Sequence, residues 1–216
     1  MCLACWYFSI MLPGCVMIDF DEATHTYSRN GVVVPSVTQV LTPLTDYSSV
    51  PKWRLGQARE RGDYVHRMCE MFVWGTLDES DLDKDYTPYL DGFKRFLKDT
   101  NFIPEHVEER VYHPQLHYAG TFDLGGSLPP KGRVRKTYRA LIDIKTTYAF
   151  MPSVGPQTAG YKDAWNKMVD KELRFEKRMA LRLKPDEYEL IPLRDEGDMN
   201  IFQSCLNVYN FMKRKD

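Results

Sequence analysis

The segment from Leu141 to Lys145 places one acidic and one basic side chain in an otherwise apolar strand pattern, Leu-Ile-Asp-Ile-Lys. Successive side chains of a strand point to opposite faces of a sheet, so Ile142 and Ile144 share one face while Asp143 and Lys145 share the other. The isoleucine face predicts burial against a core. The charged face is equally typical of an exposed ion pair and of a functional site, and this segment alone does not decide between them.

A second carboxylate lies on the strand predicted just before it, from Gly120 to Leu124. Asp123 is expected on the face opposite Phe122 and Leu124. If the two strands are neighbours, Asp123 and Asp143 converge, and converging carboxylates repel one another unless a proton or a cation intervenes. Oxygen ligands suit hard ions such as Mg²⁺ and Mn²⁺, so the pair indicates a metal site.

Two predicted helices each carry a pair of residues four positions apart. His66 follows Gly62 and lies at the margin of an apolar helix face, and the glycine leaves room beside it for an ion or a phosphate. Gln157 and Tyr161 share one face of a later helix. Taken alone, His66 is more often a packed boundary residue and the Gln157–Tyr161 pair an ordinary polar patch.

The whole chain predicts strands alternating with packing helices. The expected strands are 17–20, 24–27, 32–34, 106–112, 118–124, 139–146, 177–183 and 188–193, and the expected helices are 36–43, 51–74, 86–98, 153–169 and 199–212. Such alternation is typical of an α/β domain built on a central mixed β-sheet flanked by helices. The short strands before residue 35 and the helix after them form a small N-terminal extension.

Charge and length restrict the function further. Lys and Arg number 29 against 30 Asp and Glu, so nucleic acid could be bound only through local patches or metal ions. Residues 1–16 are expected to be a doubtful leader, with translation starting at Met11 or Met17 and a single domain over 17–216. Five cysteines and the lack of a long apolar stretch predict a cytoplasmic protein without a disulfide frame or membrane span.

Five weak motifs occur in one order: Gly62/His66, Glu108 to Val111, Gly120/Asp123, Asp143/Lys145 and Gln157/Tyr161. This order resembles the PD-(D/E)XK nuclease superfamily, most closely its RecB-like exonuclease branch, which includes phage exonucleases and the mitochondrial genome maintenance exonuclease. The resemblance covers about Met17 to Lys213. It implies a restriction-endonuclease-like core and extends to Pro35–Thr38 and Trp53, which are similar to features of phage members.

The resemblance implies a role for each motif residue. His66, Asp123, Asp143 and the backbone carbonyl of Ile144 would hold one or two Mg²⁺ or Mn²⁺ ions. Glu108 would be a further ligand, with Glu109 as its rival because strand parity is not fixed by the sequence. Lys145 would orient the attacking water and offset negative charge, and Gln157 and Tyr161 would support the site. Some relatives hold an iron–sulfur cluster, which we do not expect here because only Cys205 lies near the C-terminus.

The implied function is metal-dependent DNA exonuclease activity in phage-type recombination, replication or end processing. DNA single strands or ends would be the substrate, and a single-strand annealing or replication protein a further partner. The expected nucleic-acid contacts are Ser36, Thr38, Lys131, Arg133, Arg135 and Lys136. For the loop at 131–139, a solvated surface is an equally good explanation. A catalytically inactive nucleic-acid-binding module and a structure-specific endonuclease are the alternatives.

Overall fold

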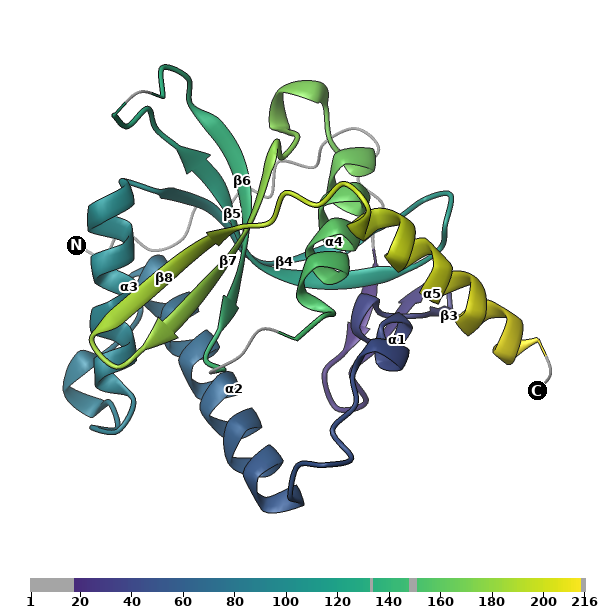
Figure 1. Ribbon diagram of the computed structural model, residues 1–216, viewed down its shortest axis with the longest axis horizontal. Coiled ribbons are helices and arrows are strands. Elements are labelled where there is room, and N and C mark those ends of the chain that lie inside the picture. The colour runs from purple at the N-terminus through teal and green to yellow at the C-terminus, as the bar shows by residue number, and fades with distance from the viewer. Residues whose placement is uncertain (1–17, 133, 148–150, 215–216) are drawn as a thin grey trace, which may run out of the picture.

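The computed structural model describes residues 18–132, 134–147 and 151–214, which form two β-sheets and the helices around them (Figure 1). The small sheet is antiparallel, with strands β1 (Asp19–Asp21), β2 (Thr26–Arg29) and β3 (Val32–Val34) in chain order. The large sheet has the order β4-β5-β6-β7-β8. Its strands are β4 (Ile103–Tyr112), β5 (Ala119–Leu128), β6 (Tyr138–Lys145), β7 (Lys177–Lys184) and β8 (Glu187–Pro192).

The large sheet is mixed, as the sequence predicts. Strands β6 and β7 are parallel, and the other neighbouring pairs are antiparallel. A parallel pair needs a crossover, and helix α4 (Val154–Met168) provides it. The expected α/β architecture with a central mixed sheet, flanking helices and an N-terminal extension is therefore confirmed.

The remaining helices begin and end where the sequence provides signals. Helix α1 (Val37–Val40) has a capping box formed by Ser36 and Gln39. The long helix α2 (Lys52–Trp74) ends at Gly75, whose φ of 69° is the left-handed conformation that glycine adopts without strain. Helices α3 (Thr87–Thr100) and α5 (Asp198–Lys213) follow, with short 3₁₀ turns at Thr42–Leu44, Glu79–Asp81 and Lys171–Leu173.

Apolar cores cover both faces of the large sheet. On one face, α2 and α3 pack against Ile142 and Ile144 of β6, and on the other, α1, α4 and α5 pack around Leu141 and Phe122. The two faces are visible as helices on either side of the strands (Figure 1). Strand β6 is therefore covered by an apolar core on each face of the sheet. This explains why the Asp143 side chain is hidden from solvent.

The sequence predicts that Phe122 and Leu124 share one face of β5, opposite Asp123, and this prediction is wrong. Phe122 packs in the core with α4, whereas Leu124 packs in the core with α2, so the two side chains do not share one face. Pairing between β5 and β6 ends at Leu124 and Ile142, and Glu108 on the other neighbour has a left-handed φ of 48°. Both departures from regular geometry occur beside Asp123.

Predictions made for residues 1–16, including the leader and the start of translation, lie outside the described residues. Within the described part, no helix is both long enough and apolar enough to cross a membrane. Cys69 and Cys205 are buried free thiols.

Candidate active site

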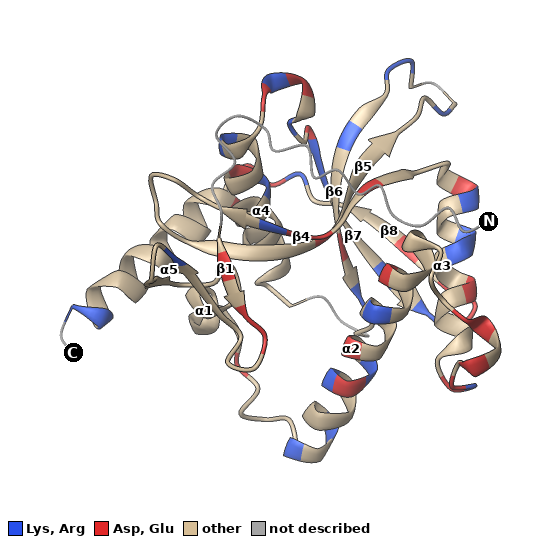
Figure 2. Ribbon diagram, turned by 180° about the vertical axis from the view of Figure 1, so that it is seen from behind, with Lys and Arg blue, Asp and Glu red and all other residues tan. Residues whose placement is uncertain are grey.

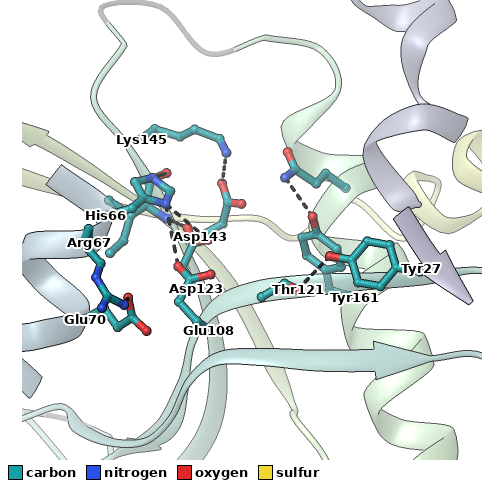
Figure 3. Close-up of polar contacts among 12 residues, drawn as sticks. Tyr27, His66, Arg67, Glu70, Glu108, Thr121, Asp123, Asp143, Lys145 and Tyr161 are labelled. Carbon is teal, nitrogen blue, oxygen red and sulfur yellow. Dashed lines mark hydrogen bonds and ion pairs between the residues drawn. The ribbon is translucent and has the colours of Figure 1, made fainter. Parts of the chain in front are cut away.

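His66 connects helix α2 to the end of β6 (Figure 3). Its Nε2 lies 3.0 Å from the carbonyl oxygen of Ile144. A carbonyl only accepts hydrogen bonds, so Nε2 carries the proton and the Nδ1 of a neutral ring presents a lone pair. That Nδ1 faces two carboxylates, at 3.6 Å from Asp123 Oδ1 and 4.0 Å from Glu108 Oε1. A lone pair that faces two anions is unfavourable without a proton or a cation between them.

His66, Glu108 and Asp123 each offer a ligand atom, and these atoms lie within 4.8 Å of one another. One imidazole nitrogen with carboxylate oxygens is a donor set that accepts hard or borderline divalent ions. The rival residue Glu109 lies elsewhere, with its Oε2 at 3.5 Å from His106 Nδ1. Glu108 reaches the cluster from a left-handed backbone position within a strand, a strained conformation of the kind that gathers at functional sites.

Asp123 is oriented by the backbone of the neighbouring strand. Its Oδ2 accepts a hydrogen bond from the N–H of Ile144, at the point where the ladder between β5 and β6 has ended. The carboxylate thus takes the place of the missing backbone acceptor. Its other oxygen, Oδ1, is left to face His66.

Asp143 lies beside this cluster and holds Lys145. Its side chain is 1% exposed, and Oδ2 is 2.7 Å from Lys145 Nζ. Its Oδ1 has no hydrogen-bond partner in the described part of the chain. A buried carboxylate oxygen without a partner is costly, so a cation at this position would remove a large desolvation penalty. The residues present therefore fit a divalent ion.

The pKa values reflect this concentration of negative charge. Burial, reinforced by Asp123, Glu70 and Asp143, raises the pKa of Glu108 to about 8. Burial also raises the pKa of Asp143 to about 6, although the Lys145 ammonium opposes the shift. Burial acts to lower the pKa of Lys145, but the Asp143 and Asp123 carboxylates outweigh it and raise that pKa. Lys145 is consequently an ammonium at neutral pH.

We expect the stability of the metal-free protein to fall as pH rises from about 5 to 8. Glu108 has an ordinary pKa of 4.5 and binds its proton more tightly in the folded chain, so deprotonation favours unfolding across this interval. Glu108 is partly exposed, which reduces the effect, so the free energy of unfolding should fall by roughly 2 kcal/mol across this interval. Urea unfolding in EDTA at several pH values measures it. Glu108→Gln should flatten the profile and Glu109→Gln should not; equal profiles for both variants would contradict the assignment.

Gln157 and Tyr161 lie on α4, and Tyr161 is on the other side of Asp143 from His66 (Figure 3). Tyr161 is 4% exposed, and its hydroxyl accepts a hydrogen bond of 3.3 Å from Gln157 Nε2. The Tyr161 ring explains why residue 120 is a glycine, because a Cβ there would lie 2.5 Å from Tyr161 Cε1. Tyr161 therefore packs against the strand that carries Asp123.

Two residues that contact the surroundings of the site were missed by sequence reasoning. Glu70 is buried, pairs with Arg67 at 2.6 Å and raises the pKa of Glu108. Its position four residues after His66, on the same face of α2, was an available signal. Tyr27 of β2 bonds to Thr121 and had no sequence signal, because the two residues are 94 positions apart.

A cleft of about 440 Å³ opens beside Lys145 and Gln157. Thr38 of α1, Tyr47 of the following connection and Arg59 of α2 also line it. Ser36 does not take part in the way expected of a nucleic-acid contact, because it is 2% exposed and its hydroxyl caps α1. Thr38 is exposed and remains available.

The basic loop between β5 and β6 lies away from the carboxylates, contrary to expectation. It precedes Tyr138, whereas Asp143 and Lys145 lie at the opposite end of β6, ~20 Å along the strand. Figure 2 shows its blue cations at the top and α2 at the bottom. Lys131 donates to the Asp99 carbonyl, Lys136 pairs with Glu176, and Arg133 lies outside the described residues. Arg135 is exposed.

Comparisons with known proteins add little. No protein-family model matches the chain, and no curated protein matches it. Among solved structures, an alkaline exonuclease (LHK-Exo) from Laribacter hongkongensis is similar at 14% identity and a TM-score of 0.42, over 83% of this chain and 91% of that one. A structure described as SSO0001 is similar at 16% identity and a TM-score of 0.33, over 72% and 71% of the two chains. At these values neither likeness carries an argument about function.

Proposed function

We propose that this protein is a divalent-metal-dependent deoxyribonuclease that hydrolyses phosphodiester bonds, and specifically an exonuclease. One observation carries the proposal: an imidazole nitrogen and two carboxylates converge within 4.8 Å, beside a buried Asp143–Lys145 pair. The order of the five motifs along the sequence also supports it. The exonuclease assignment and a phage-type role in recombination, replication or end processing follow from that resemblance.

The site residues divide the chemistry among them. His66, Glu108, Asp123 and Asp143 would hold Mg²⁺ or Mn²⁺, and the Ile144 carbonyl, which already accepts from His66, has a second lone pair to offer. The bound metal would neutralise phosphate charge and lower the pKa of a water. Lys145, held as an ammonium by Asp143, stabilises the negative charge that develops on the phosphate. An amine that stays protonated cannot remove a proton, so Lys145 positions and stabilises rather than acting as a base.

The cleft beside Lys145 is the place where a DNA strand would lie. Arg59 supplies a cation there, and the hydroxyls of Thr38 and Tyr47 supply neutral donors for phosphate oxygens. The basic loop at 131–139 is not needed for this arrangement. Its cations lie at the other end of β6, and three of them, Lys131, Lys136 and Arg139, already have partners in the protein.

The decisive experiment is a cleavage assay with Mg²⁺ or Mn²⁺ and an EDTA control. End-labelled single-stranded and double-stranded DNA should be degraded from an end, while a circular DNA of the same sequence should resist. Cleavage of the circle would favour a structure-specific endonuclease. Binding of DNA without any metal-dependent cleavage would favour the inactive nucleic-acid-binding module.

Replacing Arg59 with glutamine should weaken substrate binding without affecting the chemical step. The variant removes one phosphate contact, so KM should rise about five-fold and the salt dependence of binding should fall by about one counterion, with kcat within two-fold. Steady-state kinetics at several salt concentrations measure both. Lys98→Gln, which removes an exposed cation of α3, is the matched control. A KM that is unchanged in Arg59→Gln would remove this cleft from the substrate path.

A further inference from the structure

We propose that Tyr27 is a positioning residue of the active site, so that the N-terminal three-stranded sheet is part of the catalytic unit. This inference rests on the proposed nuclease function. Tyr27 lies on β2, outside the large sheet that carries the carboxylates. Its hydroxyl lies 2.8 Å from the Thr121 hydroxyl of β5, which is the strand that carries Asp123 (Figure 3).

Tyr27 is rigidly held at its own end. It is 2% exposed and packs in a small cluster with Val34, Tyr112 and Ala119. Its ring lies against Phe20, with centroids 4.6 Å apart. Burial raises the pKa of its phenol, so the group stays neutral. A fixed, neutral hydroxyl can hold a partner hydroxyl in one orientation.

The contact falls on β5 itself, two residues before Asp123. Gly120, the preceding residue, is covered from the other face by the Tyr161 ring, where an added Cβ would lie only 2.5 Å from Cε1. Two tyrosines from different elements thus hold β5 from both faces. Each contacts the segment that leads directly into the metal-binding carboxylate.

Side-chain support is needed there because the regular backbone constraints end at this point. The ladder between β5 and β6 stops at Leu124, and Glu108, which lies opposite Asp123 on β4, has a left-handed backbone. Without the Tyr27–Thr121 bond, β5 loses a constraint next to Asp123. The relative placement of Asp123, Glu108 and His66 should then become less exact, and catalysis is sensitive to such displacements.

The test compares Tyr27→Phe with Tyr112→Phe in the full-length protein. Tyr112 belongs to the same buried cluster, and its hydroxyl bonds to His117, away from the metal cluster. Tyr27→Phe should lower kcat about ten-fold with KM within two-fold, which corresponds to the loss of one well-placed hydrogen bond. The Mn²⁺ concentration that gives half of the maximal rise in Tm should increase about five-fold. Tyr112→Phe should leave both quantities within two-fold.

Thr121→Val should reproduce the effect of Tyr27→Phe, and the double variant should be no worse than either single variant. Unchanged kcat and an unchanged Mn²⁺ titration in Tyr27→Phe would overturn the proposal. Equal losses in Tyr27→Phe and Tyr112→Phe, in proportion to lost stability, would also overturn it, because they would show a merely structural role. Inactivity of the unaltered protein would refute the nuclease function instead, and the Mn²⁺ titration would still test the positioning.

Discussion

Asp143→Asn should reduce metal-dependent cleavage by at least about a thousand-fold while the protein remains folded. The substitution keeps the shape of the side chain but removes the charge that pairs with Lys145 and that would bind the metal. Loss of a metal ligand together with the orientation of Lys145 accounts for an effect of about 4 kcal/mol on the transition state. Initial rates on end-labelled DNA with saturating Mn²⁺ measure it.

Stability should change far less than activity. The amide removes a buried charge with an unpartnered oxygen but also leaves the Lys145 ammonium without its counter-charge, so these opposing effects should keep the change in unfolding free energy of the metal-free protein within ~1 kcal/mol. Asp198→Asn is the matched control, because Asp198 is also a buried carboxylate in an ion pair, with Arg178 at 2.9 Å, but lies outside the site. That variant should lose stability and keep its kcat. More than a few per cent of normal activity in Asp143→Asn would contradict the role assigned to this residue.

The elements of the fold that depend on local pattern could be predicted from the sequence. Alternation in β6 correctly separates Ile142 and Ile144, which pack under α2, from the charged residues, and the turn and capping residues place the helices. These features follow from neighbours along the chain. A strand or helix needs no knowledge of distant residues to show its period.

The features that the sequence left open, missed or misplaced depend on geometry between elements. Whether Glu108 or Glu109 enters the site is determined by the left-handed backbone at Glu108, which a regular strand pattern cannot reveal. Tyr27 reaches Thr121 only because two separate sheets meet, and Ser36 is buried because α1 packs on the core. The basic loop follows one acidic strand and precedes the other in sequence. Its distance from their carboxylates comes from the length of β6.

Replacing Lys145 with methionine should abolish cleavage as completely as Asp143→Asn but should destabilise the protein. The methionine fills a similar volume without the ammonium, so Asp143 becomes a buried carboxylate without its counter-charge. The pKa of Asp143, already raised by burial to about 6, should rise further. The loss of unfolding free energy should therefore be about 2–3 kcal/mol at pH 8 and smaller at pH 6, where Asp143 can take up a proton.

Lys145→Arg separates an electrostatic role from proton transfer. A guanidinium keeps the positive charge but does not lose its proton in this pH range, so it cannot act as a base. If Lys145 stabilises charge, the arginine variant should keep a measurable fraction of kcat, about 1–10%, while the methionine variant keeps none that can be detected. If Lys145 were the base, both variants would be equally inactive. Retention of more than a tenth of kcat by Lys145→Met would exclude both roles and would leave the Asp143–Lys145 pair as a structural ion pair.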